Sequence, residues 1–466
     1  MTSVTRGPRP AAGTLPPVVG GRLRPVLEMR RNMVGYAEGM WRAHGDVVRT
    51  VLGPPRLDRE IWMLHHPEAA ARVLSGSSFQ AFAKQDPVYE EVGRWLGHGL
   101  LTAEGDDWTR QKRFVQPVFT KVAVDGYGAL MVDEIERVVA DRGDVGGVVD
   151  LGRWMQELAL RVVVRALFGE SADTVIPHVR SSFPVVSDTV VRRGVGVVRL
   201  PTSVPTPRVR RGRAAQADLF GVCDAMVAAR RRTATHGAGD GTDLLSRLLA
   251  ARDGDEHLSD TEVRDQVLVF LLAGHETTST ALTFALHLLG RHPAVQDAVR
   301  AEIRDVIGHD RPTASATASL PLTTAVLRET MRLYPSAPFV SRLVVRDDEV
   351  LGHPVRAGTT VVLVPWTIHR HPDFWDDPLT FDPGRFSPEA EAAAHRHRYA
   401  WMPFGGGPRA CIGQHFSMVE ALLALALLLR DHRVTAVAGT DHLPVDALIT
   451  LFPTEPVLAR VERLTG

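Results

Sequence analysis

The feature that most constrains the fold is a segment of about thirty residues, from Ser259 to Leu289, in which apolar side chains recur at helical spacing. Ser259-x-x-Glu262 has the pattern of a capping box and begins the predicted helix, while Gly290 and Pro293 end it. At a rise of ~1.5 Å per residue this helix is about 45 Å long, which is enough to cross a whole domain. Its part VLVFLLAG is apolar on all sides, so we expect the rest of the chain to surround it.

Most of the remaining chain is also predicted to be helical. Residues 45–64 alternate around a Gly-Pro-Pro turn, which predicts a β-hairpin, and short strand-like runs are expected at 339–345 and 359–364. Helical periodicity extends over residues 108–119, 129–141, 151–168, 214–232, 323–333 and 414–430. We therefore expect a mainly α-helical protein.

The 466 residues exceed the ~100–200 of a typical domain, but no Gly/Ser-rich or strongly charged linker divides the periodic apolar segments. We predict a flexible, Pro-rich N-terminal segment at residues 1–25 and a single domain at 26–466. The strongest candidate for a linker is Pro201 to Arg213. Its arginines are expected to lie in a solvated loop and are Arg208, Arg210, Arg211 and Arg213.

Charge and cysteine content exclude some functions. Lys+Arg and Asp+Glu balance at 54 each, so the global positive charge typical of nucleic-acid binding is missing. The cysteines Cys223 and Cys411 form no disulfide framework, which is typical of a reducing compartment and favours a cytoplasmic location. Cys223 is expected to be a small packed side chain. Neither the N-terminus nor the apolar run 421–429 resembles a signal peptide or a membrane anchor.

The strongest functional motif is PFGGGPRACIG, residues 403–413, directly before an apolar helix. Glycines allow positive φ and close approach to a flat ligand, and the N–H groups and dipole of a helix N-terminus lower the pKa of a thiol. Such a loop suits Cys411 for presenting a thiolate to a metal. The alternative for a single cysteine is a buried free thiol beside a glycine turn.

Phe404-Gly-Gly-Gly-Pro-Arg409-x-Cys411-Ile-Gly413 resembles the haem-binding signature of the cytochrome P-450 family. The resemblance implies the mainly α-helical P-450 fold with a small β-rich lobe and non-covalently bound haem b. It also implies that Cys411 ligates the iron and that Phe404, Gly405 and Gly413 border the haem.

Two further motifs of that family occur in its order along the chain. Glu329 and Arg332 match its Glu-x-x-Arg element, and Phe381-x-Pro-x-Arg385-Phe386 matches the element that follows. Opposite charges three residues apart on a helix are able to bond, although most such pairs are exposed and contribute under ~1 kcal/mol. The resemblance implies that Arg385 joins Glu329 and Arg332 in a buried triad that holds the cysteine loop, a structural role.

Ala273-Gly274-His-Glu276-Thr277-Thr278, in the long helix, matches the oxygen-binding groove of that family. The hydroxyl of Thr277 is able to bond to the carbonyl of Ala273 and open the helix locally. Glu276 and Thr277 then provide an acid beside an alcohol, the pair needed to deliver protons during oxygen activation. The alternative is a Thr-rich stretch that only bonds to its own backbone.

The propionates of haem require cations and hydrogen-bond donors. The resemblance assigns these to Trp108, Lys112, Arg342 and Arg409, with Arg113 as a substitute for Lys112. It also places a mainly apolar set around the substrate, namely Phe79, Phe82, Val88, Tyr89, Trp95, Leu272, Ala273, Phe339, Val340 and Leu451.

The function implied is insertion of one atom of O2 into a lipophilic small molecule by hydroxylation or epoxidation. We expect a terpenoid of secondary metabolism first, then a macrolide or fatty acid. Because one fold uses all 466 residues, electrons are expected from a separate ferredoxin and ferredoxin reductase, attracted by Lys112, Arg113 and Arg409. The alternatives are desaturation, ring coupling or peroxygenation, and a non-catalytic haem sensor or carrier. The acid–alcohol pair disfavours peroxide use and the non-catalytic role.

Several histidines attract attention without matching a metal motif. His369, His371, His395 and His397 are expected in surface loops, where they lack the spacing of metal ligands on a regular element.

Overall fold

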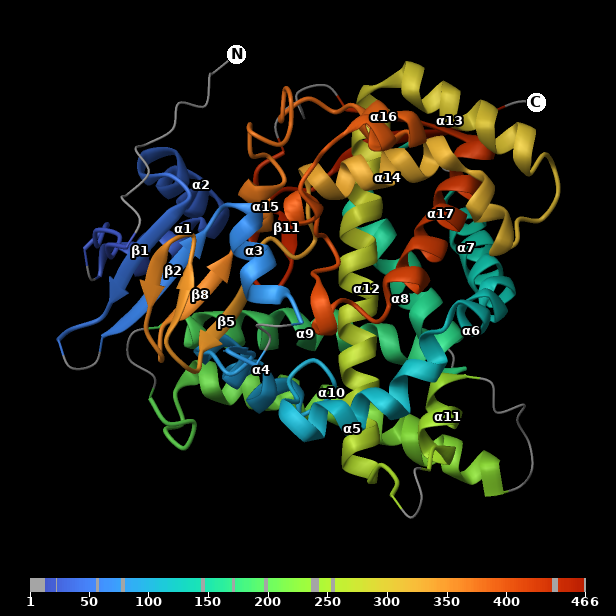
Figure 1. Cartoon of the computed structure of the whole chain (residues 1–466). Helices are drawn as coiled ribbons and strands as arrows, with labels where there is room; N and C mark the ends of the chain where they lie inside the picture. The colour runs from blue at the N-terminus through green and yellow to red at the C-terminus, as the bar shows by residue number, and fades with distance from the viewer. Residues whose placement is uncertain are drawn as a thin grey trace.

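The computed structural model has a helical body and a smaller β-rich lobe, built from the N-terminal strands and from strands near residue 350 (Figure 1). It describes residues 13–21, 23–55, 58–76, 80–143, 147–169, 172–196, 200–235, 243–252, 256–437 and 443–464. The expected mainly α-helical class with a β-rich lobe is therefore confirmed.

The α-helices are α1 Arg24–Arg31, α2 Met33–His44, α3 Pro67–Leu74, α4 Pro87–Leu96, α5 Gly105–Val115, α6 Lys121–Gly126, α7 Gly128–Gly143, α8 Leu151–Phe168, α9 Ala172–Gly194, α10 Pro207–Thr235, α11 Leu244–Ala250, α12 Asp260–Arg291, α13 Pro293–Val306, α14 Pro321–Leu333, α15 Pro365–Ile368, α16 Pro388–Ala393 and α17 Gln414–Asp431. Short 3-10 turns are η1 Gln116–Phe119, η2 Ser315–Ser319, η3 Pro383–Phe386, η4 Arg398–Ala400 and η5 Gly407–Arg409.

The strands are β1 Val47–Leu52, β2 Arg59–Leu64, β3 Phe82–Ala83, β4 Val148–Asp150, β5 Val340–Val344, β6 Asp348–Val350, β7 His353–Val355, β8 Thr360–Leu363, β9 His432–Ala436, β10 Val445–Ala447, β11 Leu451–Pro453 and β12 Leu458–Arg463. The largest sheet has the order β1-β2-β8-β5-β3. The predicted hairpin is its antiparallel β1–β2 pair, in which Val47 faces Leu64. A separate two-stranded sheet pairs β10 with β11.

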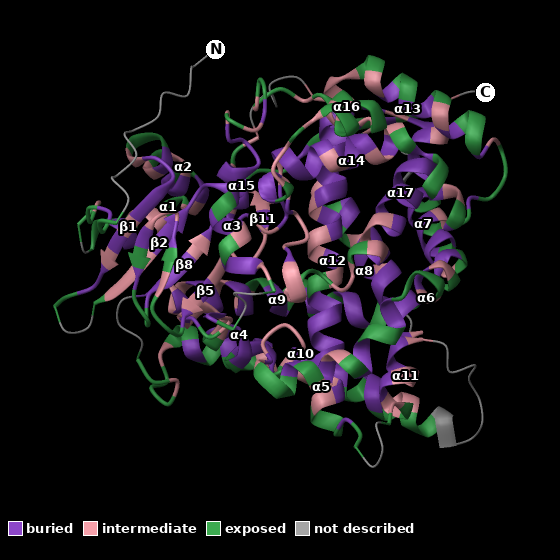
Figure 2. Ribbon diagram, viewed as in Figure 1, coloured by how far each residue is buried: buried purple, intermediate pink, exposed green. Residues whose placement is uncertain are grey.

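The long helix α12 crosses the body and is buried over most of its length (Figure 2). Ser259 and Glu262 form the expected capping box. A Cβ on Gly274 would lie 3.0 Å from a methyl of Val163, so this glycine lets α12 pack tightly on α8. Among the described residues α12 is the one helix long and apolar enough to cross a membrane, but 72% of its most apolar window is buried inside the protein.

The predicted and observed elements differ in two places. The segment expected as a linker turns into helix at Pro207, so Arg208 to Arg213 lie on the first turns of α10 and not in a loop. Residues 172–194, for which no element was expected, form α9. Of the expected N-terminal segment, residues 1–12 and 22 lie outside the described part, and Val18 pairs with Arg49 of β1.

Candidate active site

The cysteine loop is held by its own backbone and by close contact with α3. The Cys411 amide donates to the Phe404 carbonyl at 2.9 Å, and the Gly405 amide donates to Met402 at 3.0 Å. Gly407 has φ +65°, and a Cβ there would overlap the carbonyl oxygen of Leu74. Glycine is therefore required where the loop approaches α3.

Cys411 is surrounded by protein and yet keeps accessible surface. Burial raises the pKa of the thiol, and the Gly413 amide and the Lys84 ammonium act in the opposite direction. The Gly413 amide at the start of α17 thus acts on this pKa in the expected direction, but burial outweighs it in the protein alone. A bound metal cation would reverse the balance, because a coordinating thiol is deprotonated.

Lys84, Arg342 and Arg409 gather near Cys411. Glu104 is the acidic neighbour of Lys84 and Arg409, and Asp86 is that of Arg342. Burial and the two arginines lower the pKa of Lys84. Arg409 pairs with Glu104 at 2.8 Å. Its Nη1 is nonetheless buried and makes no hydrogen bond to any residue that the structure describes. The cluster is therefore built to receive additional negative charge.

Trp108 and Lys112, which the sequence assigned to the haem propionates, lie beside this cluster. The Arg409 guanidinium lies over the Trp108 ring at 4.2 Å, and the Lys112 ammonium lies over the same ring at 4.8 Å. Lys112 donates to the Pro408 carbonyl at 3.2 Å, so it contacts the backbone of the cysteine loop. Arg409 was also expected to attract an electron donor, but its side chain is 6% exposed and points inward.

Lys84 was missed because it belongs to no motif. One signal was available: the chain has lysine only at positions 84, 112 and 121, and its other cations are arginines. Two of these rare lysines contact the cluster or the loop. A thiol beside three cations, one of them with an unpaired buried nitrogen, fits a flat iron-containing group that carries anionic arms.

Glu329, Arg332 and Arg385 come together in the interior. Arg332 makes two hydrogen bonds of 2.7 Å to the Glu329 carboxylate, and Arg385 Nε lies 3.5 Å from Glu329 Oε1. Arg332 also donates to the backbone carbonyls of His369 and Pro378 at 3.0 and 2.6 Å. His369 Nε2 in turn accepts from the Met402 amide, so these contacts lead from α14 to the start of the cysteine loop.

The groove of α12 has the expected local geometry. Thr277 Oγ1 donates to the Ala273 carbonyl at 2.9 Å, and the Thr277 carbonyl accepts from Ser336 Oγ at 2.8 Å. Glu276 Oε2 accepts from Thr450 Oγ1 at 2.6 Å. Burial raises the pKa of Glu276 to about 7, against the opposing effect of the Thr450 hydrogen bond. Glu276 is therefore able to gain and lose a proton near neutral pH.

An apolar cavity of about 330 Å³ lies beside this groove. Of the expected pocket residues, those that line it are Val88, Tyr89, Leu272, Ala273, Phe339 and Val340. Three do not: Phe82 packs in the core of the β-rich lobe, Trp95 is buried with its Nε1 on Glu91, and Leu451 borders a second cavity. Phe79 lies outside the described residues.

Sequence reasoning missed the N-terminal part of the lining. Met29 of α1, Met33 of α2 and Met63 of β2 cover the cavity from the β-rich lobe, and Phe183 of α9 covers it from the helical body. No local pattern distinguishes these side chains from ordinary core residues, because only the tertiary fold brings them to one wall.

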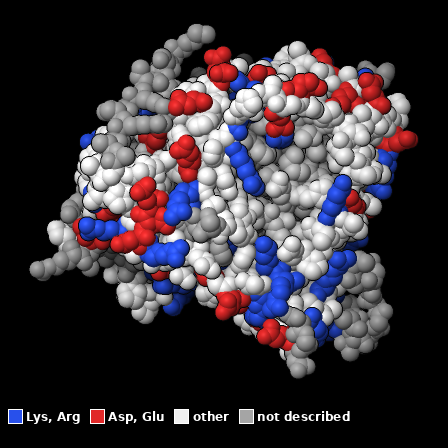
Figure 3. Space-filling model, viewed as in Figure 1, with Lys and Arg blue, Asp and Glu red and all other residues white. Residues whose placement is uncertain are grey.

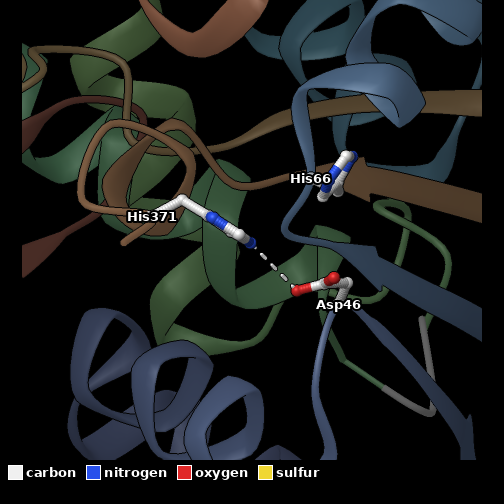
Figure 4. A group of neighbouring side chains, drawn as sticks. All are labelled: Asp46, His66 and His371. Atoms are coloured by element: carbon white, nitrogen blue, oxygen red, sulfur yellow. Dashed lines mark hydrogen bonds and ion pairs between the residues drawn. The ribbon is translucent and has the colours of Figure 1, made fainter. Parts of the chain in front are cut away.

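The expected surface histidines include two that are fully buried, His369 and His371. His371 Nε2 lies 3.2 Å from Asp46 Oδ1, and His66 is their neighbour (Figure 4). The Nδ1 atoms of His66 and His371 accept backbone N–H groups from Glu68 and Asp373. The neutral rings then carry their protons on Nε2, which suits donation to Asp46 and not metal coordination. We assign this cluster a structural role.

Comparisons with known proteins agree with this geometry. Residues 17–461 match the family model described as Cytochrome P450. Cyclooctat-9-en-7-ol 5-monooxygenase from Streptomyces melanosporofaciens is 34% identical over 88% of this chain and 89% of the relative. Pentalenene oxygenase from Streptomyces avermitilis is 34% identical over 95% of each chain. The crystal structure of the cytochrome P450DA heme domain matches 99% of both chains with a TM-score of 0.80 and 27% identity.

Proposed function

The chain belongs to the cytochrome P450 family and is a monooxygenase, and from this premise we propose that it binds haem b and oxidises a terpenoid with electrons from separate redox proteins. The observation that carries the proposal is the single thiol of Cys411 beside Lys84, Arg342 and Arg409. A metal ligand next to a cationic cluster matches an iron porphyrin with two propionates.

In this proposal Cys411 Sγ would ligate the iron, and Lys84, Arg342 and Arg409 would hold the propionates. When bound, haem b supplies the redox chemistry that activates O2. Glu329 and Arg332 position the cysteine loop through the backbone carbonyls that Arg332 binds between residues 369 and 380.

Glu276 and Thr277 are proposed to deliver protons. The Glu276 carboxyl, with its pKa near 7, holds a proton that Thr277 is placed to organise in the α12 groove. This acid–alcohol pair supports the use of O2 and disfavours a purely peroxide-dependent reaction.

The apolar lining supports a lipophilic substrate. Side chains from α1, α2, α4, α9 and α12 enclose the cavity, and most of them are aliphatic, methionine or phenylalanine. The two named relatives act, by their names, on pentalenene and on cyclooctat-9-en-7-ol. As the substrate we therefore propose a hydrocarbon or singly hydroxylated terpenoid, ahead of a macrolide or a fatty acid.

The electron donor is proposed to be a ferredoxin with its reductase. The matched cytochrome P450DA structure is a heme domain, and the match covers 99% of this chain. Lys and Arg side chains gather on the lower part of one face, in the region where Figure 1 places α5 (Figure 3). The half-buried Lys112 and the exposed Arg113 of α5 suit an acidic protein docked near the cysteine loop.

The proposal is tested by spectroscopy followed by turnover. The reduced, carbon monoxide-bound protein should show the red-shifted Soret band of thiolate ligation, and Cys411→Ser should lose it. Cys223→Ser, which changes the other cysteine, should keep it. With ferredoxin, ferredoxin reductase, NADPH and 18O2, pentalenene should gain one labelled oxygen atom. An unchanged band in Cys411→Ser would refute the ligand, and turnover with NADPH alone would refute the need for separate redox proteins.

A further inference from the structure

Glu276 lies on the wall between two cavities of different character. On one side is the apolar cavity of about 330 Å³, and on the other is a cavity of about 430 Å³ between α8, α9, α12 and the β10–β11 hairpin. A larger share of its lining is polar than in the first, and it is called the polar cavity below. On the α12 side the polar cavity is lined by Ser279, Thr280 and Thr283. Thr450, at the tip of the hairpin, borders both cavities together with Glu276.

The hairpin holds Thr450 firmly against α12. The Leu451 carbonyl accepts from Thr280 Oγ1 at 3.2 Å, and the Leu451 amide donates to the Ser336 carbonyl at 2.9 Å. The Leu448 amide donates to the Thr450 carbonyl at 3.1 Å and closes the turn. With its backbone fixed in this way, Thr450 directs its hydroxyl at Glu276 Oε2, 2.6 Å away.

Among the described residues no cation forms an ion pair with Glu276, and Thr450 makes the one hydrogen bond to its carboxyl. Charged groups do face the two cavities from the surrounding elements. They are Asp150, Arg153 and Glu455 on the polar side, and Arg59 and Asp86 on the apolar side. Arg153 lies 3.6 Å from Asp150, Arg59 bonds to the carbonyls of Gly194 and Gly196, and Asp86 accepts from Ser341. The Glu276 carboxyl is thus oriented by a neutral hydroxyl.

We propose that Thr450 is a positioning residue, which holds the Glu276 carboxyl between the two cavities so that it carries protons from the polar cavity to the apolar one. This inference rests on the proposed function. Because Oε2 accepts the Thr450 hydrogen bond, the transferable proton belongs to Oε1. Glu276 gives that proton toward Thr277 and regains one from water in the polar cavity, while Thr450 keeps its own.

The first test reads the carboxyl directly and needs no turnover. Infrared difference spectra over pH identify the Glu276 carboxyl band as the one lost in Glu276→Gln. In the wild type its midpoint should lie near 7. Thr450→Val keeps the side-chain shape but removes the donor, so the band should move in frequency and its midpoint should rise by about one pH unit. Thr450→Ser should restore the wild-type frequency and midpoint of the band.

A matched control lies on the same hairpin. Thr454 also borders the polar cavity, but its hydroxyl donates to the Pro444 carbonyl and not to Glu276. Thr454→Val should leave the Glu276 band unchanged. An unmoved band in Thr450→Val, or an equal shift in Thr454→Val, would overturn the proposal.

The second test measures coupling with pentalenene, ferredoxin and ferredoxin reductase. Thr450→Val should retain the carbon monoxide spectrum and consume NADPH, but release a several-fold larger share of electrons as hydrogen peroxide. Thr450→Ser and Thr454→Val should couple like the wild type. If the wild type oxidises pentalenene and Thr450→Val is equally well coupled, only this inference fails. If the wild type consumes no NADPH with the terpenoids tested, the proposed substrate class fails, and the infrared test still decides the role of Thr450.

Discussion

Arg332 and Glu329, one turn apart on α14, form a two-fold ion pair with both N···O distances at 2.7 Å and no exposed surface on either side chain. The pair is not isolated, because Arg332 also donates to the carbonyls of His369, Pro378 and Thr380. Glu329 further accepts from the Asp382 amide at 3.0 Å. One buried pair therefore fixes the path of the irregular segment that precedes the cysteine loop.

Replacing Glu329 by Gln should destabilise the protein strongly. The change keeps the shape but leaves the Arg332 charge buried without a counterion, which typically costs about 3–5 kcal/mol. The free energy of unfolding, measured with urea, should fall, and so should the ratio of haem to protein absorbance. Glu28→Gln is the control, because Glu28 pairs with Arg24 at the same 2.7 Å but in an exposed position. If both variants lose the same free energy of unfolding, burial of the α14 pair does not contribute to stability.

Lys84→Gln should weaken retention of haem. It removes one cation from the cluster formed with Arg342 and Arg409, and we expect about tenfold faster transfer of haem to apomyoglobin. Lys121→Gln changes an exposed lysine at the start of α6 and should behave like the wild type. If the two variants release haem at the same rate, Lys84 does not hold a propionate.

The elements that could be predicted from the sequence are those with a regular apolar pattern and clear ends. α8 begins at Leu151 and ends at Phe168 as expected, and the capping box at Ser259 begins α12. α9 was missed because Pro177 and Pro184 lie inside it, and proline is normally read as a helix break. His371 was placed on the surface because it follows a loop-like pattern, although the fold buries it against Asp46.

Some contacts of the candidate site could also be predicted from the sequence, and others could not. Glu329 with Arg332 and Ala273 with Thr277 lie within one or two helical turns, so their contacts follow from local spacing. Lys84 and Thr450 could not be found in this way. Thr450 lies 174 residues from Glu276 in the sequence, on a hairpin that no pattern predicted. Contacts of this kind depend on the tertiary packing alone.

Two glycines of the cysteine loop should respond differently to alanine. Gly405 and Gly407 both have positive φ, so each substitution strains the backbone by about 1–2 kcal/mol. A Cβ on Gly405 meets nothing within 4 Å, whereas one on Gly407 overlaps the Leu74 carbonyl oxygen. Gly407→Ala should therefore lose most of its haem, while Gly405→Ala should keep it with a modest fall in melting temperature. The opposite order would contradict the described contact with α3.

Glu276→Gln should change how stability depends on pH. Burial raises the pKa of Glu276 from its ordinary 4.5 to about 7, so the folded protein keeps a proton that the unfolded chain releases between these values. Wild-type stability should therefore fall relative to Glu276→Gln as pH rises from 4.5 to 7, and the difference should stay constant above that. We expect a difference on the order of 1–3 kcal/mol from urea unfolding. A difference that is independent of pH would refute the raised pKa.

Thr277→Ala tests whether the α12 hydroxyl serves proton delivery or only its own helix. Thr277 Oγ1 bonds to the carbonyl four residues back, and Thr189 Oγ1 makes the same kind of bond to Val185 on α9, at 2.8 Å. Thr189→Ala is therefore the control for loss of the backbone bond. Cys411 is intact in both variants, and Thr277→Ala changes only one of the side chains that line the apolar cavity. Carbon monoxide and terpenoid-binding spectra should therefore stay close to those of the wild type.

Oxygen chemistry should distinguish the two threonines. General-acid placement typically contributes ~10²–10⁴-fold, and water partly replaces a missing hydroxyl, so the loss of product in Thr277→Ala should be smaller than that range. NADPH should still be consumed, but a larger share of electrons should appear as hydrogen peroxide, whereas Thr189→Ala should remain coupled. NADPH, peroxide and oxidised terpenoid have to be measured in the same reaction, because a slower reaction alone does not reveal uncoupling. If Thr277→Ala keeps the wild-type ratio of product to NADPH, its hydroxyl only bonds to the helix backbone, and proton delivery then depends on Glu276 without it.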